Sequence, residues 1–521
     1  MTLRISLLAS TFALAPARSA AAQPAHSARV DYIIVGIDSL SGRRRMMKAL
    51  ALTLTLSALA ACGGGRNAHY DLVIANGRVM DPESGLDAVR HIGIVDDSIL
   101  AISASPLAAD STTRVIDATN LVVAPGFIDL HEHGQNAESY ALMVRDGVTS
   151  AFELEVGTAD VAGWYKAREG GQIVNHGVSV GHIPARMKVL RDPGTGLLPS
   201  GIGGSGSATE AQIGEMEEIL ARGLREGAVA VGFGSAYTPG ATMAEIARLF
   251  RVATAGNASV HIHMRNGVAG LDSTIAAADS ARAKLHIVHV NSSADTSLTA
   301  FLARIEAARA RGQDVTTEAY PYGAGMTEIT SALFDDFKSW PDARFAQHQL
   351  VATGKRLDRR SFEQARRTGG TVIIHGRSDE QTRAAIVSPL SMVASDGFIE
   401  RGRGHPRTSG SYSKVLGRYV REDKALPLMD AIRKMTLMPA RRLEARVPMM
   451  AKKGRVRLGD DADLTIFDPA TVIDRSTYED ATIPAAGIPF VIVGGRLVVD
   501  SGRVTSARPG RAIRAPELTN P

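Results

Sequence analysis

The stretch Leu121-Val-Val-Ala-Pro-Gly-Phe-Ile-Asp-Leu-His-Glu-His133 decides how the rest of the sequence is interpreted. A first apolar run ends at the Pro125-Gly126 break, and a second, Phe127–Leu130, leads directly into His131 and His133. Residues i and i+2 of a strand point to the same face, so the two imidazoles are predicted to project side by side from a strand end. Imidazole is a common ligand of zinc and related ions, and the pair therefore predicts part of a metal site.

Polar residues that could complete this site follow later apolar runs. Glu153 and Glu155 alternate with apolar residues, so both carboxylates are predicted to point inward, where bare charges are costly without a cation. Glu155 is nearer the end of its strand and is the first choice as a ligand. The later candidates are two imidazole pairs and an acid: His261 with His263, His286 with His289, and Asp396.

The middle of the chain, residues 125–441, alternates short apolar strands with helical stretches such as Ala208–Arg225 and Met243–Ala255. This pattern predicts an α/β fold in which a parallel sheet closes as a distorted (β/α)8 barrel. Chemistry in such barrels takes place at the C-terminal ends of the strands. Asp396 ends the last apolar strand and is predicted to be the general base beside a metal-activated water.

Both ends of the chain carry short apolar strands that are predicted to build one small β-sandwich, from residues 69–124 and 442–515. Near Tyr70 the pattern predicts two strands around a hairpin turn at Asn76-Gly77. The segment Val493–Leu497 repeats the pattern of Ala75–Val79 near the other end.

Residues 1–68 are predicted to be a targeting segment and tether. Met1–Gln23 has the features of a secretory signal, and a second basic and apolar run ends at Leu-Ala-Ala-Cys62-Gly, which resembles a bacterial lipobox. Because two signals in series make little physical sense, translation is expected to start at Met46 or Met47. A lipid on Cys62 would place the protein in the periplasm, on the outer membrane, and would be its only membrane contact.

The composition excludes several other classes of protein. The formal net charge is +5, but the basic clusters at Arg43–Arg45 and Arg503–Arg514 are not interleaved with aromatic residues, so no nucleic-acid partner is predicted. Cys62 is the only cysteine, which excludes an intramolecular disulfide. The partner expected is a small-molecule amide substrate, and the sequence does not predict an oligomeric state.

From about Tyr70 to Arg514 the chain resembles the amidohydrolase superfamily, and within it the D-aminoacylase (N-acyl-D-amino-acid deacylase) group. Segments that carry the resemblance include Ser235–Gly240, His263–Arg265, Asp314–Tyr322 and His405–Arg407. The resemblance implies one or two ions of Zn²⁺ or another divalent metal. His263 and His289 are then the ligands of the tighter site, His131 and His133 those of the weaker one, and Asp396 the catalytic acid–base.

The sequence departs from this group at one metal ligand. The group places a cysteine near the end of the strand that here contains Glu153 and Glu155, and this strand contains no cysteine in the present sequence. Glu155, or Glu153, is the expected substitute and would give a harder site of nitrogen and oxygen ligands. A carboxylated Lys188 is a rival.

A second departure concerns the substrate. The group holds the substrate carboxylate with a lysine, a tyrosine and an arginine, and the lysine position is occupied here by Asn291. An arginine can hold a carboxylate alone through its bidentate fork. The segment from Ser331 to Gly370 also looks short for the group, so the loops that select the acyl chain are expected to differ. The predicted substrate-binding residues are Arg407, Tyr237, Tyr320, Tyr322 and Asn291.

Three functions are compatible with these residues. The first is a metal-dependent hydrolase that cleaves the C–N amide bond of an N-acyl amino acid or a dipeptide-like substrate. The second is a cyclic amidase or imidase, similar to dihydroorotases and hydantoinases. The third is a non-catalytic lipoprotein binding module on a decayed barrel. The retained arginine and tyrosines favour the first, and the complete set of candidate ligands disfavours the third.

Overall fold

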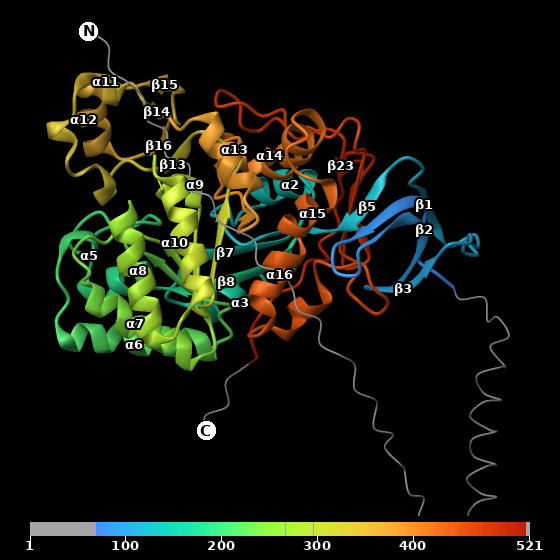
Figure 1. The fold of residues 1–521 in the computed structure, drawn as a ribbon, viewed down its shortest axis with the longest axis horizontal. Helices are drawn as coiled ribbons and strands as arrows, with labels where there is room; N and C mark the ends of the chain where they lie inside the picture. The colour runs from blue at the N-terminus through green and yellow to red at the C-terminus, as the bar shows by residue number, and fades with distance from the viewer. Residues whose placement is uncertain (1–68, 266, 295, 517–521) are drawn as a thin grey trace, which may run out of the picture. The chain divides into compact units, whose positions relative to one another are not determined.

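The computed structural model describes residues 69–516, except 266 and 295. The predicted signal, lipobox and Cys62 lie outside the described residues. Within them, no helix is both long and apolar enough to span a bilayer. Figure 1 shows a central barrel, with the strands β1–β3 on one side of it and a small subdomain containing α11 and α12 on another.

The barrel consists of eight strands that pair in parallel in the order of the chain. Beyond the strand ends, the first and last strands are joined by backbone hydrogen bonds from Asp396 to His131 (2.7 Å) and from His133 to Gly397 (3.0 Å). The predicted α/β barrel is confirmed. Its strands are β6 (Phe127–Asp129), β7 (Val148–Thr158), β8 (Asn175–Gly181), β9 (Val231–Gly234), β10 (Ser259–His263), β11 (Lys284–Ile287), β12 (Val315–Ala319) and β17 (Ser391–Val393).

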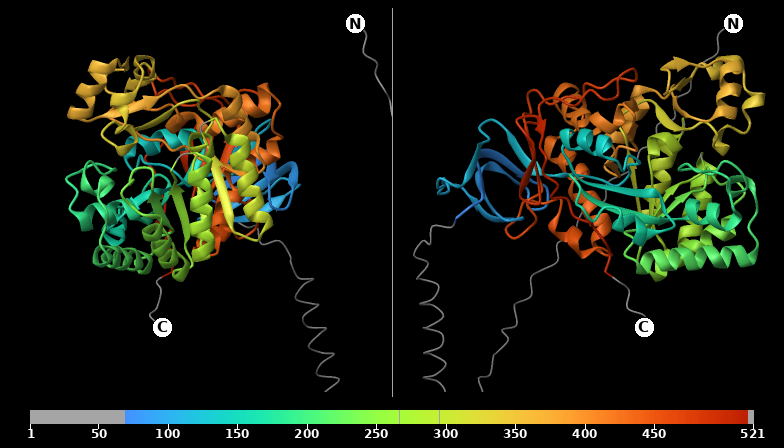
Figure 2. Two further views of the ribbon diagram at one scale, coloured as in Figure 1. Left: turned by 60° about the vertical axis from the view of Figure 1, so that its left-hand side comes forward. Right: turned by 180° about the vertical axis from the view of Figure 1, so that it is seen from behind.

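Amphipathic helices cover the outside of the barrel (Figure 2). In α7 (Met243–Ala255) the buried residues Ile246, Leu249, Phe250 and Ala253 follow the helical period, and Thr242 caps the first turn by accepting a hydrogen bond from the Glu245 amide. The longer helices around the barrel, α7 included, are α2 (Ala137–Arg145), α4 (His182–Leu190), α6 (Glu210–Arg225), α7 (Met243–Ala255), α8 (Val268–Ala281), α10 (Leu298–Ala310), α13 (Asp379–Val387), α14 (Arg407–Lys414), α15 (Leu428–Met435) and α16 (Leu437–Glu444).

The two sets of terminal strands, which were predicted to build one small β-sandwich, pair with each other in one nine-stranded sheet. The central contact joins β5 and β20 in antiparallel register, with Val123 opposite Ile466. One apolar cluster contains residues from both ends, including Ile74, Ile92 and Ile492. The strands are β1 (Leu72–Asp81), β2 (Leu86–Val95), β3 (Ser98–Ser103), β4 (Arg114–Asp117), β5 (Val122–Pro125), β20 (Leu464–Phe467), β21 (Phe490–Val493), β22 (Arg496–Asp500) and β23 (Arg503–Val504).

The predicted hairpin at Asn76-Gly77 is wrong. β1 continues through both residues, and its register with β2 shifts between Ile74 and Gly77, which makes a bulge. Asn76 adopts the left-handed conformation (φ 62°) that a bulge or a turn can equally use. The similar Gly494-Gly495 does form the turn between β21 and β22, with positive φ at both residues.

A small subdomain is inserted between β12 and β17, and it was not predicted. It holds a four-stranded antiparallel sheet and its own aromatic cluster, which includes Phe334, Trp340 and Phe362. Its elements are β13 (Gly325–Glu328), α11 (Asp342–Phe345), β14 (His348–Leu350), β15 (Lys355–Arg356), α12 (Arg359–Thr368) and β16 (Thr371–Ile374).

Candidate metal centre and active site

One cluster of imidazoles and carboxylates lies at the C-terminal end of the barrel. Each member is located at or just beyond the end of a strand, which is where this fold places its chemistry. Apart from His131 and His133, which follow the same strand, these residues are far apart in the sequence, and the closed barrel brings the ends of their five strands together. The members are His131 and His133 after β6, Glu155 on β7, His263 on β10, His289 after β11 and Asp396 after β17.

Glu155 is shared between two groups of potential metal ligands. Its Oε2 lies 2.5 Å from His131 Nε2 and 3.5 Å from His133 Nε2. Its Oε1 lies 3.0 Å from His263 Nδ1, and its Oε2 3.9 Å from His289 Nε2. We call His131, His133, Glu155 and Asp396 the first group, and Glu155, His263 and His289 the second group. The ligand atoms of each group lie within 4.8 Å of one another.

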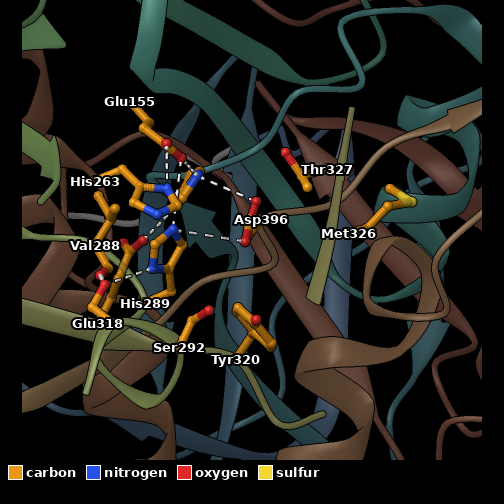
Figure 3. A network of polar contacts seen from close by, with 12 residues as sticks. Glu155, His263, Val288, His289, Ser292, Glu318, Tyr320, Met326, Thr327 and Asp396 are labelled. Carbon is orange, nitrogen blue, oxygen red and sulfur yellow. Dashed lines mark hydrogen bonds and ion pairs between the residues drawn. The ribbon is translucent and has the colours of Figure 1, made fainter. Parts of the chain in front are cut away.

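Asp396 lies next to His131 and His133, and Figure 3 shows its carboxylate across from Glu155, His263 and His289. Its Oδ1 lies 3.3 Å from His133 Nε2 and 3.4 Å from His131 Nε2. Its Oδ2 lies 2.8 Å from Arg407 Nη1. Both Asp396 (φ 53°) and His289 (φ 33°) hold left-handed backbone conformations that cost free energy, and such residues concentrate at functional sites.

The carboxylates of this cluster are held in their ionised form. Burial alone would raise the pKa of Asp396, but the charges of Arg407 and His131 lower it below its usual value. The pKa of Glu155 is also lowered, because the charges of His131 and His263 outweigh its burial. Two buried carboxylates that stay charged are suited to bind a cation.

The imidazoles of the first group are oriented from behind by carboxylates. The Nδ1 atom of His131 lies 2.6 Å from Glu318 Oε1, and that of His133 lies 2.5 Å from Glu153 Oε2. This arrangement leaves each Nε2 atom free to face the cluster, and the two Nε2 atoms are 3.2 Å apart. Such carboxylate–histidine pairs fix the ring orientation and raise the basicity of a metal ligand.

The donor set of the cluster fits a divalent metal. Tetrahedral zinc with bonds of about 2.0–2.1 Å places its ligand atoms about 3.3 Å apart, close to the spacing in the first group. In the second group, burial and the charge of His263 lower the pKa of His289 to about 3, so its imidazole is neutral, as a ligand must be. Nitrogen and carboxylate oxygen together suit zinc and related ions.

Two cavities meet at this cluster. Tyr237, Met326, Thr327 and Asp396 line both of them. The first, of about 280 Å³, is lined by the carboxylates Glu155, Glu328, Asp396 and Glu400 and by apolar residues, and we call it the acidic cavity. The second, of about 510 Å³, is lined by Arg344 and Arg377 as well as His263 and His289, and we call it the basic cavity.

The sequence is similar to those of known amidohydrolases. Residues 183–499 match the model of the amidohydrolase family, and the chain is 33% identical over 489 residues to an N-acyl-D-glutamate deacylase of Alcaligenes xylosoxydans xylosoxydans. That alignment covers 85% of this chain and 96% of the relative. The chain belongs to the amidohydrolase family. The predicted class, a metal-dependent hydrolase of C–N amide bonds, is thereby confirmed.

One further relative and one solved structure are also similar to this amidohydrolase. A D-aminoacylase of the same organism is 29% identical, with 85% of this chain and 97% of the relative covered. The crystal structure of an N-acyl-D-glutamate deacylase from Bordetella bronchiseptica, complexed with zinc and a phosphonate inhibitor, has the same fold. Its TM-score is 0.73 at 24% identity, and the match covers 86% of this chain and all of that one. The predicted cofactor, zinc or another divalent metal, is confirmed.

The structure distinguishes the three predicted candidates for the shared ligand. Glu155 lies inside the cluster, whereas Glu153 lies behind His133 and also accepts a hydrogen bond from the Val156 amide at 2.9 Å. Lys188 is exposed near the end of α4 and is outside both groups. The other two candidate imidazoles, those of His261 and His286, are not part of the cluster. They lie deeper in the barrel, where His261 is hydrogen-bonded to Ser259 and His286 to Glu318.

The predicted substrate-binding residues of the amidohydrolase fall into three kinds. Tyr237 and Tyr320 line the cavities, and the Tyr237 ring packs edge-on against His263. Arg407 is fully buried and pairs with Asp396, with its guanidinium carbon 4.7 Å from the centre of the Tyr320 ring. The remaining two residues lie elsewhere.

Tyr322 and Asn291, the other two predicted substrate-binding residues, line neither of the two cavities. The Tyr322 hydroxyl donates to Asp474 at 3.0 Å. The Asn291 amide is buried and donates to the Tyr320 carbonyl oxygen at 3.0 Å. Asn291 therefore positions the backbone of Tyr320.

Sequence reasoning missed Arg377, Ser292 and Thr327. All three line the basic cavity, and Arg377 comes from the inserted subdomain, just beyond β16. A signal was present, because Arg377 follows the apolar strand Thr371–Ile374 in the same manner as the candidate ligands follow theirs.

Proposed function

We propose that this amidohydrolase is an N-acyl-D-amino-acid deacylase, which hydrolyses the amide bond between an acyl group and an amino acid. The observation that carries the proposal is the cluster in which Glu155 joins two imidazole groups while Asp396 faces them at the junction of two cavities. Relatives named as N-acyl-D-glutamate deacylase and D-aminoacylase support the substrate class and its configuration.

The proposed ligands are His131, His133, Glu155 and Asp396 for one ion, and Glu155, His263 and His289 for the other. A divalent metal bound there supplies Lewis-acid chemistry, because it lowers the pKa of water and polarises a carbonyl oxygen. Glu318 and Glu153 hold the first two imidazoles in the orientation that presents Nε2 to the cluster. The chain thus offers a prearranged donor set from five strands.

Asp396 is proposed to move the proton of the reaction. Its lowered pKa keeps it ionised at neutral pH, so its carboxylate can accept a proton from the attacking water. As the C–N bond breaks, the same carboxyl group returns that proton to the leaving nitrogen. Water thus adds its hydroxyl to the acyl carbon and its proton to the amine, which gives a carboxylate and a free amino acid. Arg407 supports the first step because it stabilises the ionised form of Asp396.

The proposal is tested with purified, zinc-loaded enzyme on matched N-acetyl-D- and N-acetyl-L-amino acids, with dihydroorotate and hydantoin as cyclic amides. Release of free amino acid from the D-series, abolished in Asp396→Asn, is the expected result. Turnover of only the cyclic amides would replace the proposal with the cyclic amidase function. A protein that binds no metal and cleaves nothing would refute both.

We also propose that the protein is exported and anchored to the outer membrane through a lipid on Cys62. The lipobox-like sequence before Cys62 supports this proposal. Mass spectrometry of the mature protein is expected to find lipidated Cys62 at the N-terminus, and Cys62→Ser is expected to release the enzyme from the membrane fraction. A mature chain that starts near Gln23 would contradict this.

A further inference from the structure

Arg377 is a cation at the wall of the basic cavity. Its Nη1 donates to the Tyr320 hydroxyl at 3.2 Å and to the Tyr322 carbonyl at 3.3 Å, and its Nη2 donates to Ser292 Oγ at 3.0 Å. All three acceptors are neutral oxygens. They use three of the five N–H donors of the guanidinium, so the group is fixed in place and keeps donors for a further acceptor.

The charges around this cavity are unbalanced. Two guanidinium groups lie over the Tyr320 ring, with the carbon of Arg407 at 4.7 Å and that of Arg377 at 5.5 Å from its centre. In the described part of the chain, Asp396 is the only carboxylate that lines the basic cavity, and it is already paired with Arg407. A half-buried cation with neutral partners is suited to bind an anion from solution.

The acidic cavity has the opposite character. Its carboxylates repel an anion, and Val156, Leu197, Leu198 and Phe398 offer it an apolar surface. The two cavities share Asp396, where the scissile bond must lie. A substrate with one anionic end and one apolar end therefore has a single favourable orientation across the cluster.

We infer that Arg377, together with Ser292 and the Tyr320 hydroxyl, binds a carboxylate of the substrate in the basic cavity and selects for substrates that carry one. This inference rests on the proposed function, because it takes the substrate to be an N-acyl amino acid. Ser292 and Tyr320 lie on the same side of His289 in Figure 3, so the bound carboxylate would be close to the second group. The carboxylate is the α-carboxylate or the side-chain carboxylate of an acidic amino acid.

The test compares Arg377→Gln with wild type on two pairs of substrates. N-acetyl-D-leucine against its α-carboxamide reports on the α-carboxylate, and N-acetyl-D-glutamate against N-acetyl-D-glutamine reports on the side chain. Loss of a charged hydrogen bond is expected to lower kcat/KM for the acid of one pair by roughly 10- to 100-fold, mainly through KM, with its neutral partner unchanged. The pair that loses its discrimination identifies the carboxylate.

Two further variants separate binding from general disturbance. Arg377→Lys keeps the charge and is expected to recover part of the preference for the acid. Arg367→Gln makes the same change of charge at an exposed site on α12 and is expected to behave as wild type. The inference would be overturned if Arg377→Gln lowered kcat/KM equally for the acid and the amide substrates, or lowered it for neither.

Failure of the proposed function is distinguished by a binding measurement. Calorimetry with the same four ligands on the zinc-loaded Asp396→Asn protein reports affinity without turnover. Tighter binding of the acids that is lost when Arg377→Gln is added supports the inference even if wild type cleaves none of the four. Equal affinities for acids and amides would overturn it, while turnover by wild type would still support the deacylase function.

Discussion

The two ligand groups share Glu155 but are prepared for a metal in different ways. In the first group, carboxylates hold both imidazoles from behind, and the charges of the cluster outweigh burial to raise the pKa values of His131 and His133 well above the usual value. In the second group, the Nδ1 atom of His289 faces the Ser293 hydroxyl at 3.3 Å and no carboxylate of the described residues, and burial and the charge of His263 lower its pKa to about 3. The first group must therefore release protons to bind a metal, whereas His289 is already neutral.

This difference shows that two groups of similar ligands can bind the same kind of metal ion with different affinities. A group that must lose protons binds its ion more weakly at a given pH, and the penalty grows as the pH falls. The second group carries no such cost at His289. We therefore expect the second group to hold the tighter ion, in agreement with the ligand order that the resemblance implies.

The largest effect on metal content and activity is expected from removing Glu155, the ligand that both groups share. Glu155→Ala deletes a ligand from both, so the metal content should fall from two ions, or one, to none. Activity should fall by more than the roughly 10²- to 10⁴-fold that loss of one acid–base group costs. Metal analysis beside kinetics checks this, with Lys188→Ala as the exposed control that keeps both properties. Full metal content in Glu155→Ala would show that another residue joins the groups.

Single-group variants separate the two sites. His263→Ala is expected to remove the tighter ion and most of the activity, whereas His133→Ala is expected to lower occupancy only of the weaker one. Zinc titration with a chromophoric chelator measures both affinities in each variant. If His133→Ala loses the tight ion and His263→Ala retains it, the order of the two groups is reversed.

The part of the site that was predicted from sequence follows from local geometry. The spacing of His131 and His133, and the position of Glu155 near the end of its strand, place side chains on one face of a strand whatever surrounds it. The barrel then brings strand ends together without further information. Asp396 was predicted for the same reason, since it follows the last apolar strand.

What was missed depends on contacts across the chain. Arg377 follows a strand, but β16 belongs to the inserted sheet, and only the tertiary fold brings it to Tyr320. The sequence alone could not show that Tyr320 lines the basic cavity whereas Tyr322 is hydrogen-bonded to Asp474. Asn76-Gly77 carries a hairpin signal, yet β2 pairs along the whole of β1, so a bulge absorbs the left-handed residue.

A smaller effect is expected behind the imidazoles. Glu153→Gln keeps a hydrogen-bond acceptor for His133 but removes the charge, and a change at such a position typically lowers metal affinity about 10- to 100-fold. The corresponding Ser293→Ala change in the second group removes one long hydrogen bond and should cost less. Metal titration of the two variants measures the contrast. Equal losses of metal affinity in the two variants would show that the first group does not depend on its supporting carboxylate more than the second group depends on the Ser293 hydroxyl.

The mildest way to separate the groups is acidification of the unmodified enzyme. The raised pKa values of His131 and His133 mean that their protonated forms compete with metal first, so lowering the pH should release the ion of the first group. Because the pKa of His289 lies near 3, its imidazole stays neutral and the ion of the second group should remain. Metal content after dialysis between pH 8 and about 5.5 is expected to fall by one ion and to recover when zinc is added back at pH 8.

The control is the same pH series on His133→Ala, which lacks the weaker site, and its metal content should stay constant across the series. A loss of both ions in a single step would show that the shared carboxylate of Glu155 couples the groups too strongly for the histidines to act separately.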